Sequence, residues 1–267
     1  MKRLLNFIII LPLSLFVFGC AGPTIDVDSD EFDHIEAISD EFDDIVNIYR
    51  GIVSYKGEPF SGILTKSFEN GQLKFKTPFK DGKQDGIWEQ YYENGQLEKK
   101  KPYKDGKEDG IFERYYENGQ LELKIPYKDG KLNGIWKEYY ENGQLESKIP
   151  YKDGKEDGIW EQYYENGQLE SKVHYKDGKD DGIWEGYYED GQLKFKKTFK
   201  DGKLNGIWKE YFEDGQLKVK KTYYYGKENG ICEAYYEDGK LEFKGTYLDG
   251  QRAGIWKEYY ENGQLKA

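Results

Sequence analysis

The sequence predicts an all-β protein, a repeat array of antiparallel β-hairpins with a 24-residue period that forms an elongated, twisted, single-layer meander sheet. Three observations lead to this prediction. A short Asn/Asp-Gly-Gln/Lys-Leu motif recurs at a constant interval, strand-like runs of Ile, Trp and Tyr lie between its copies, and glycines recur at the joints. The array shows no helical spacing of apolar residues, and so many glycines would oppose a helix.

Three markers define the repeat. The Asn/Asp-Gly motif starts every 24 residues, at Asn70, Asn94, Asn118, Asn142, Asn166, Asp190, Asp214, Asp238 and Asn262. An Asp-Gly pair follows each copy except the last, at Asp81, Asp105, Asp129, Asp153, Asp177, Asp201 and Asp249, with Tyr225-Gly226 in the remaining place. A Gly-Ile-Trp motif or a close variant comes next. We therefore assign residues 51–267 to an array of about nine copies.

Each copy reads as two strands. In the copy that starts at Gly86, residues 87–93 form the first strand and residues 96–104 form the return strand. Asn94-Gly95 between them is typical of a type I′ turn, which would pair Glu93 with Gln96 and Tyr92 with Leu97. The whole array should then contain about seventeen strands and extend on the order of 80 Å as one open sheet.

Side chains on a strand alternate between faces, so the predicted pairing divides the residues into two sets. One face carries Trp88, Gln90, Tyr92, Leu97, Lys99, Lys101 and Tyr103, and the other carries Ile87, Glu89, Tyr91, Glu98, Lys100 and Pro102. The Trp88 position is apolar in every copy and the Tyr92 position is always aromatic, so we expect this face to be buried. The other face should be exposed. An isoleucine stands at the Ile87 position in all nine copies, on the face that we expect to meet solvent.

The N-terminal segment predicts export and lipidation. Lys2 and Arg3 precede an apolar run that is short for a membrane span, so residues 1–19 read as a signal peptide. The run ends in Val17-Phe18-Gly19-Cys20, which resembles the lipobox of bacterial lipoproteins. That resemblance implies cleavage before Cys20 and acylation of this residue, hence a protein bound to membrane lipid in the bacterial cell envelope. Alanine after the cysteine favours the outer membrane if the cell is Gram-negative. An ordinary signal peptide with an incidental cysteine is the alternative.

Residues 20–50 form an acidic linker. They hold ten acidic residues and one base, whereas the array is nearly balanced in charge. Such a density of like charge favours an extended tether. Apolar residues such as Phe32, Ile35 and Phe42 recur at spacings close to helical, so a short amphipathic helix is an equal alternative.

Composition excludes several classes of function. The chain has a net charge of −11, so the positive surface that a nucleic-acid-binding protein needs is not expected. It has two histidines and, besides Cys20, only Cys232. A zinc site, a disulfide framework or a cysteine protease dyad therefore has few residues to draw on. We expect no catalytic residues, no cofactor and no metal site.

The repeat resembles a known family. The run 151–158, Tyr-Lys-Asp-Gly-Lys-Glu-Asp-Gly, is followed by an aromatic strand and Glu165-Asn166-Gly167, and this combination is similar to the MORN repeat, in its bacterial variant form. The resemblance covers about residues 53–267. It implies single-layer hairpin stacks that contact proteins or lipids rather than catalyse a reaction, and some members are labelled antitoxin components.

These observations lead us to expect a membrane-anchored, non-catalytic protein that binds or scaffolds another protein, in one version as the antitoxin or immunity partner of a toxin. Cell-wall or surface glycan binding is the alternative, because aligned exposed aromatic rings can stack on sugars. The predicted partner face is the row of tyrosines formed by Tyr91, Tyr115, Tyr139, Tyr163, Tyr187, Tyr211, Tyr235 and Tyr259.

Overall fold

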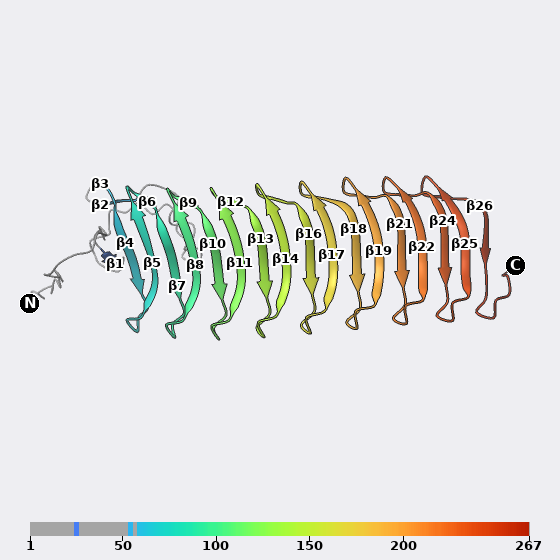
Figure 1. Cartoon of the computed structure of the whole chain (residues 1–267), viewed down its shortest axis with the longest axis horizontal. Helices are drawn as coiled ribbons and strands as arrows, with labels where there is room; N and C mark the ends of the chain where they lie inside the picture. Colours follow the sequence, from blue (N-terminus) through green and yellow to red (C-terminus); the bar gives the residue numbers. More distant parts are fainter. Residues whose placement is uncertain (1–23, 27–52, 56–57, 267) are drawn as a thin grey trace, which may run out of the picture.

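The computed structural model describes residues 24–26, 53–55 and 58–266, and every regular element within them is a β-strand. Seventeen strands of six to nine residues form the array, as the sequence predicts (Figure 1). They are β4 (Gly62–Ser67), β5 (Leu73–Lys80), β7 (Gly86–Tyr91), β8 (Leu97–Lys104), β10 (Gly110–Tyr115), β11 (Leu121–Lys128), β13 (Gly134–Tyr139), β14 (Leu145–Lys152), β16 (Gly158–Tyr163), β17 (Leu169–Lys176), β18 (Lys179–Tyr187), β19 (Leu193–Lys200), β21 (Gly206–Tyr211), β22 (Leu217–Tyr224), β24 (Gly230–Tyr235), β25 (Leu241–Leu248) and β26 (Gln251–Glu258).

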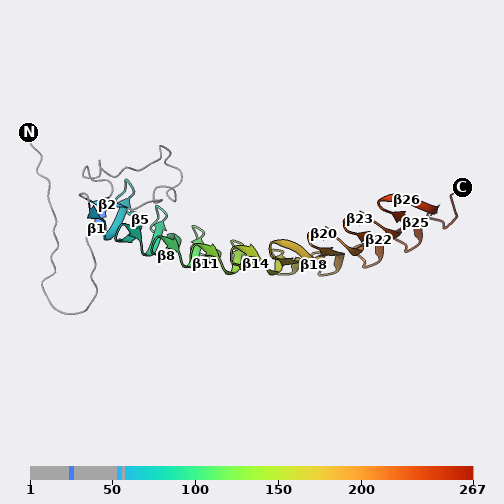
Figure 2. The ribbon, with the colours of Figure 1, turned by 90° about the horizontal axis from the view of Figure 1, so that it is seen from above.

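Two-residue strands complete the array at the joints between hairpins. They are β6 (Lys83–Gln84), β9 (Lys107–Glu108), β12 (Lys131–Leu132), β15 (Lys155–Glu156), β20 (Lys203–Leu204) and β23 (Lys227–Glu228). Each strand of the array pairs antiparallel with its neighbours in the chain, which gives one open meander sheet. Viewed along the strands, the sheet is a single layer that bends into a shallow arc (Figure 2).

Three short strands precede the array. They are β1 (Thr24–Asp26), β2 (Ser54–Tyr55) and β3 (Glu58–Pro59). β1 pairs with β4 in parallel, so it adds a strand to the first edge of the sheet. The expectation of a tether or a helix is therefore wrong for residues 24–26, because their backbone groups take up the hydrogen bonds of this edge. Cys20, the signal peptide and the rest of the acidic linker lie outside the described residues.

The Asn-Gly turns have a different geometry from the one predicted. Gly95 N donates to Tyr92 O at 2.9 Å and Tyr92 N donates to Gln96 O at 2.9 Å, and only the glycine of the Asn-Gly pair has a positive φ. This is a type I turn followed by a left-handed glycine, which forms a three-residue loop with a bulge. The predicted type I′ turn is wrong here because Asn94 keeps a negative φ, and its side-chain oxygen accepts a hydrogen bond from Gln96 N at 2.9 Å.

The bulge changes the pairing next to the turn and leaves the rest of the hairpin as predicted. Trp88 faces Lys101 and Gln90 faces Lys99, but the register then shifts and Tyr91 faces Leu97. Leu97 therefore lies opposite Tyr91 and not Tyr92. Because of this shift, Leu97 and Glu98 lie on the opposite faces from those predicted. Glu98 Oε2, for example, accepts a hydrogen bond from Gln90 Nε2 at 2.6 Å. The predicted faces are wrong for Leu97 and Glu98, because one extra residue reverses the alternation.

The type I′ turn occurs instead at the Asp-Gly pairs. Asp105 and Gly106 have φ values of 50° and 79°, and the flanking Lys104 and Lys107 form the closing pair of the two-residue loop. Aspartate is one of the few residues besides glycine and asparagine that tolerate this left-handed backbone. Gly106 N also donates to Gln84 O at 2.8 Å, so each of these turns is tied to the preceding copy.

Burial is concentrated on one side of the sheet. We call the side that carries Trp88, Gln90, Lys99, Lys101, Tyr103 and their equivalents the aromatic face. Its most buried residues include Leu64, Phe75, Thr77, Trp88, Leu123, Ile125, Ser147, Val173 and Cys232. Tryptophans pack on the aromatic residue of the return strand, as Trp136 does on Tyr151 at 6.1 Å between ring centroids. On this face, contacts between the side chains of adjacent strands thus stabilise the sheet.

Candidate functional site

The opposite side of the sheet carries three parallel rows of side chains, and we call it the charged face. The first row holds Ile87 and its equivalents, the middle row holds Glu89 and Lys100 with theirs, and the third row holds Tyr91 and its equivalents. The strand register puts Glu89 opposite Lys100 within one hairpin and opposite Lys76 of the preceding one. Each row therefore runs across the strands from one hairpin to the next.

Ion pairs connect neighbouring hairpins along the middle row. Glu113 Oε1 lies 2.9 Å from Lys124 Nζ, and its Oε2 lies 3.5 Å from Lys100 Nζ. Glu185 has the same arrangement, with Lys172 and Lys196 each at 2.7 Å. Each of these carboxylates is shared between the strand before it and the strand after it. The middle row is therefore a continuous network in its acidic stretches, which is a stronger arrangement than isolated surface pairs.

Acid should weaken this network. Burial alone would raise the pKa of Glu185, but hydrogen bonds from Lys172, Lys196 and Tyr187 outweigh burial and lower the pKa from 4.5 to about 2. A carboxylate with a lowered pKa in the folded state contributes stability above its unfolded pKa and loses it as the pH falls towards the folded pKa. We expect urea unfolding to show stability falling between about pH 4.5 and pH 2. The Glu185→Gln variant should show a flatter decline, whereas Glu189→Gln, in an exposed turn, should decline as the wild type does. Equal slopes for Glu185→Gln and wild type would contradict this.

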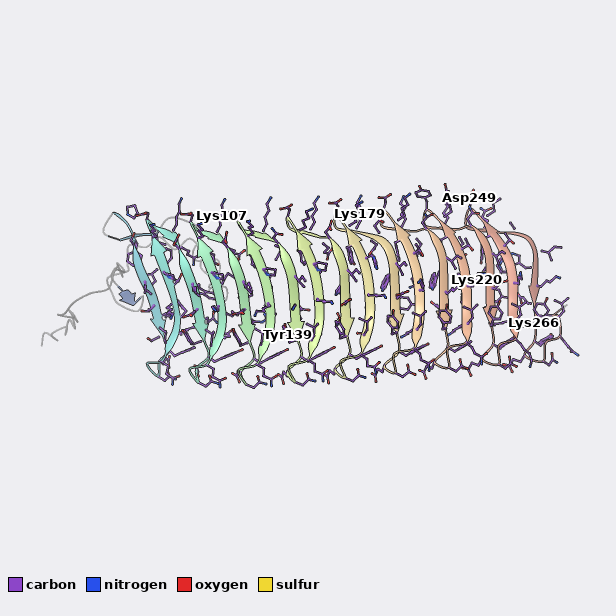
Figure 3. All side chains as sticks on the ribbon, in the orientation of Figure 1. Lys107, Tyr139, Lys179, Lys220, Asp249 and Lys266 are labelled. Atoms are coloured by element: carbon purple, nitrogen blue, oxygen red, sulfur yellow. The ribbon has the colours of Figure 1, made fainter. Side chains whose placement is uncertain are left out.

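The eight predicted partner tyrosines lie together on the charged face, where they form its third row. Tyr139, one of them, lies near the Asn-Gly end of its strand (Figure 3). All eight are half-buried. Tyr91 donates its hydroxyl to Glu89 at 2.8 Å, and Tyr115 donates to Glu113 at 3.0 Å. The rings of this row are partly available, but these hydroxyl groups are already used within the sheet.

Lysine replaces glutamate in the middle row in three copies, at Lys137, Lys209 and Lys257, and Lys257 in the last copy faces Lys244. Lys137 faces Lys124 and Lys148, and Lys209 faces Lys196 and Lys220. Among the described residues, neither Lys137 nor Lys209 has an ion-pair partner of its own. Three lysines of adjacent strands therefore meet around Lys137 and again around Lys209, three copies later.

The isoleucine row is the most exposed apolar feature of the charged face. Ile87, Ile111, Ile135, Ile159, Ile207 and Ile231 expose between 42% and 51% of their surface, and Ile255 exposes 82%. All of them except Ile255, which lies on the last strand, face the residue of the return strand that is proline in the early copies, such as Pro102 opposite Ile87. A signal for this row is present in the sequence, because isoleucine is constant there in all nine copies on the face predicted to be exposed. Our sequence-based prediction of the partner face nevertheless named the tyrosines and omitted the isoleucines.

On the aromatic face, a second row of tyrosines joins adjacent copies. The Tyr92 hydroxyl donates to the main-chain carbonyl of Tyr115 at 2.7 Å, across to the next hairpin. The same bond is made by Tyr116, Tyr140, Tyr164, Tyr188 and Tyr236. Each bond supplies a donor to a carbonyl at the end of a strand, next to the bulge, which explains why the position is tyrosine in most copies. Phe212 occupies this position without a hydroxyl, so the carbonyl of Tyr235 lacks this donor.

Three lysines replace apolar residues in the middle of the aromatic face. Lys101 and Lys221 reach Glu108 and Glu228 at 2.7 and 2.8 Å. In the copy of Lys197, a leucine, Leu204, occupies the position that Glu108 and Glu228 have in the other two. The Lys197 ammonium lies over the rings of Trp184, Phe195 and Trp208 at 5.1, 4.5 and 4.4 Å from their centroids, and burial lowers its pKa. Cation–π contacts take the place of an ion pair at this lysine.

Within the part of the chain that the structure describes, no group of three or more His, Cys, Asp and Glu side chains could hold a metal ion. Cys232 is buried at a position that is tryptophan in most copies, and burial raises the pKa of its thiol. None of the described residues forms a helix long and apolar enough to cross a membrane. The described surface presents apolar, aromatic and charged side chains.

A single-layer sheet of repeated hairpins with two different faces defines a class of protein, the β-hairpin repeat proteins. The family model described as the MORN repeat variant matches nine consecutive segments of the chain, at residues 61–81, 84–105, 108–129, 132–153, 156–177, 180–201, 204–223, 228–249 and 252–267. The chain therefore belongs to the MORN repeat variant family, as its sequence motifs predict. Comparison with curated proteins finds no match.

Proposed function

We propose that this protein is a lipid-anchored, non-catalytic interaction protein that binds another protein through its charged face. The isoleucine row carries the proposal. An apolar residue that is more than 40% exposed and recurs in nearly every copy adds little to the packing of the sheet. Contiguous exposed apolar residues rimmed by charges are typical of protein-binding surfaces.

The middle row supports the choice of a protein partner. Its alternating carboxylates and lysines offer both signs of charge, and the positive clusters around Lys137 and Lys209 break the repetition. A partner with carboxylates at a matching separation would bind in one register along the array. Electrostatic complementarity of this kind contributes specificity and association rate more than affinity. An antitoxin or immunity role, in which the array covers a toxin, is the specific form of this proposal.

Anchoring and the absence of catalysis belong to the same proposal. Acylation at Cys20 with more than one chain would hold the protein stably at a bilayer without a membrane-spanning helix. The carboxylates of the charged face serve as members of a repeated ion-pair network and no copy stands out as a reaction centre. Replacing Cys20 with serine should release the protein from the membrane fraction, and retention of that variant would contradict the anchor.

Crosslinking the full-length acylated protein in its native envelope, followed by identification of the captured species, tests the function. We expect one stoichiometric protein. The triple variant Ile111→Thr, Ile135→Thr and Ile159→Thr should lose it, because threonine keeps the β-branched shape that suits a strand while removing apolar surface. The matched control replaces Lys107, Lys131 and Lys155 with threonine at the exposed Asp-Gly edge of the same copies (Figure 3), and it should retain the partner.

Each other outcome changes the conclusion. If the isoleucine variant still captures the partner, the binding surface does not lie on the charged face. Recovery of cell-wall fragments would favour glycan binding through the half-buried tyrosine row. Recovery of lipid alone would indicate a structural spacer. Circular dichroism and the urea midpoint of both triple variants should match the wild type, which separates lost binding from lost fold.

A further inference from the structure

Two Asp-Gly joints near the C-terminal end of the array carry apolar side chains where the other joints are charged. The strand residue before the Asp-Gly pair is lysine in six copies, and it is exposed in all of them. Tyr224 and Leu248 take its place in the next two copies, where they expose 59% and 60% of their surface. Tyr225 replaces the aspartate of its turn and is 47% exposed. Apolar surface therefore stands here in place of lysine and aspartate.

The backbone of Tyr225 is strained, and its side chain gains little packing in return. Its φ is +46°, a left-handed conformation that aspartate tolerates and that is unusual for a bulky side chain. Its N–H donates to Asn205 Oδ1 at 3.3 Å, much as the N–H of Asp105 donates to Asp85, so this bond does not require a tyrosine. The ring stands edge-on to that of Tyr224, which is itself exposed. Strain at such an exposed side chain indicates a role outside the packing of the sheet.

These apolar side chains extend the isoleucine row towards the Asp-Gly edge. Leu248 lies two residues after Thr246 on β25, and side chains two apart on a strand share a face. Thr246 faces Ile231, which is 44% exposed. We call Tyr224, Tyr225, Ile231 and Leu248 the C-terminal patch. It lies on the charged face, and it reaches the edge at which Asp249 is labelled in Figure 3.

Lysines border the C-terminal patch on the same face. The middle row of these copies holds Lys220, Glu233, Lys244 and Lys257 on successive strands. Glu233 lies 2.6 Å from Lys244 and 3.8 Å from Lys220, so the one carboxylate is shared between two lysines. Lys257 is exposed and has no ion-pair partner among the described residues. A partner at the patch would therefore meet apolar side chains beside an excess of positive charge.

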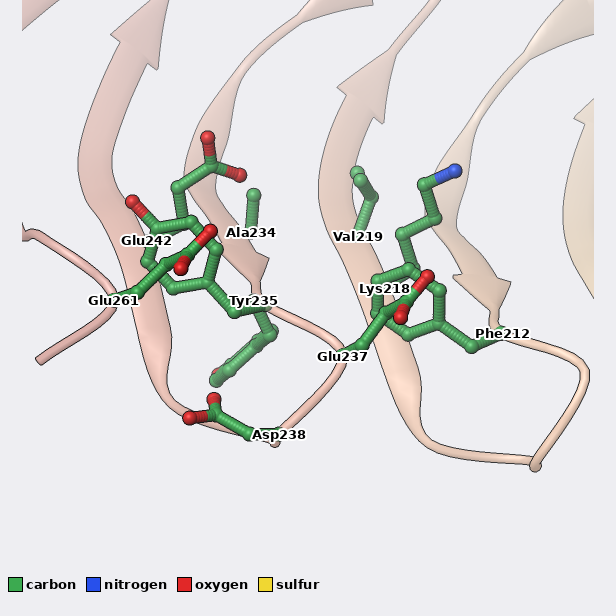
Figure 4. A pocket seen from close by; sticks show the side chains of 10 residues that line it. Phe212, Lys218, Val219, Ala234, Tyr235, Glu237, Asp238, Glu242 and Glu261 are labelled. Carbon is green, nitrogen blue, oxygen red and sulfur yellow. The ribbon is translucent and has the colours of Figure 1, made fainter.

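The aromatic face of the same hairpins offers the opposite charge. A hollow of about 460 Å³ lies there, next to the loop that joins β24 to β25 (Figure 4). Ala234 in its lining is only 3% exposed, so it adds little apolar surface. The charged side chains that line the hollow are one lysine and four carboxylates, namely Lys218, Glu237, Asp238, Glu242 and Glu261. An acidic partner would therefore be repelled from this face and attracted to the patch.

We propose that the C-terminal patch anchors a protein partner and takes from it a segment that carries apolar side chains beside carboxylates. This proposal rests on the proposed function, because it places that segment on the charged face. The rings of Tyr224 and Tyr225 and the side chain of Leu248 would cover the apolar groups. Lys244 and Lys257 would receive the carboxylates. Tyrosine suits such an anchor, because it supplies a large, rigid contact area and is enriched among the residues that dominate binding energy.

A variant that restores the common repeat separates binding from folding. The triple variant Tyr224→Lys, Tyr225→Asp and Leu248→Lys gives both joints the Lys-Asp pair of the other copies. It should raise the thermal midpoint of the full-length acylated protein, because the strain at position 225 is relieved. It also makes the charged face more positive, so attraction between charges alone would strengthen the binding of an acidic peptide. We expect weaker binding, because apolar surface is lost.

The probe is a blocked, fluorescently labelled peptide of alternating leucine and glutamate, titrated with the protein in detergent and followed by anisotropy. We expect the wild type to bind it at least tenfold more tightly than the triple variant does. The wild type should also prefer it at least tenfold over the same peptide with lysine in place of glutamate. The control variant, Tyr224→Phe with Leu248→Ile, keeps the apolar surface and should bind as the wild type does.

Several results would overturn the proposal. They are equal affinity of the wild type and the triple variant, equal affinity for the two peptides, and a lower thermal midpoint for the triple variant. In the native envelope, p-benzoylphenylalanine in place of Tyr225 should crosslink to another protein, and a crosslink to lipid or to a second copy of this chain would contradict the proposal. Capture through Ile111, Ile135 and Ile159 is a separate measurement, so failure of this proposal and failure of the proposed function can be told apart.

Discussion

Replacing Gly158 with alanine is expected to lower the free energy of unfolding by about 3 kcal/mol, through backbone strain and a steric clash together. Gly158 has a φ of +130°, and a Cβ added there would lie 2.8 Å from Pro150 Cγ. The proline ring occupies the space that only glycine leaves free. The same packing recurs at Gly86, Gly110 and Gly134, which explains why Gly begins the Gly-Ile-Trp motif in these copies.

Gly154 provides the control in the same copy. It has a φ of +83°, but a Cβ added there meets nothing within 4 Å, so Gly154→Ala should cost only the backbone term of roughly 1 kcal/mol. Combining Pro150→Ala with Gly158→Ala should recover the steric part of the loss. Urea unfolding of the four proteins measures these differences. A Gly158→Ala variant as stable as Gly154→Ala would show that contact with Pro150 does not constrain the joint.

A second large effect is expected at Gly186, where Gly186→Gln should cost about 2–3 kcal/mol through overpacking. Gly186 faces Phe195 across the hairpin, and a Cβ there would come within 2.3 Å of the ring. Its φ is not in the left-handed region, so the cost is steric. In the preceding copy the long side chain of Gln162 faces the small Ser171, so a glutamine fits there.

The double variant Gly186→Gln with Phe195→Ser reproduces the pair found in that preceding copy. It should be more stable than the sum of the two single changes predicts, by about 2 kcal/mol in a double-mutant cycle. The wild-type fold, checked by circular dichroism, should persist in all four proteins. Additive single and double effects would mean that the ring does not fill the space above Gly186.

In a later copy, His174 replaces the proline that packs against the first glycine of the Gly-Ile-Trp motif. It stands where the four earlier copies have proline. In the structure its Cβ takes the place of the proline ring, 2.9 Å from the position of a Cβ on Gly182. Thr198 and Thr222 fill the same place over Gly206 and Gly230. The histidine is therefore explained by packing.

The sequence by itself determined the period, the strands and most of the division into two faces. Because the motif recurs nine times, departures in single copies do not obscure the period. The alternation of side chains along a strand then assigns Trp88 and Glu89 to opposite faces without any knowledge of the fold. The constant isoleucine was also visible in the sequence. Its exposure could be expected there, but only the structure shows that the described residues leave more than 40% of its surface uncovered in most copies.

Only the tertiary structure decided which turn takes which form, and the reason is that both Asn-Gly and Asp-Gly suit more than one turn. Contact with the neighbouring hairpin selects among them: the Tyr92 hydroxyl bonds to the carbonyl beside the next bulge, and Gly106 N bonds to the preceding copy. These contacts join residues about 23 positions apart, so no local pattern contains them.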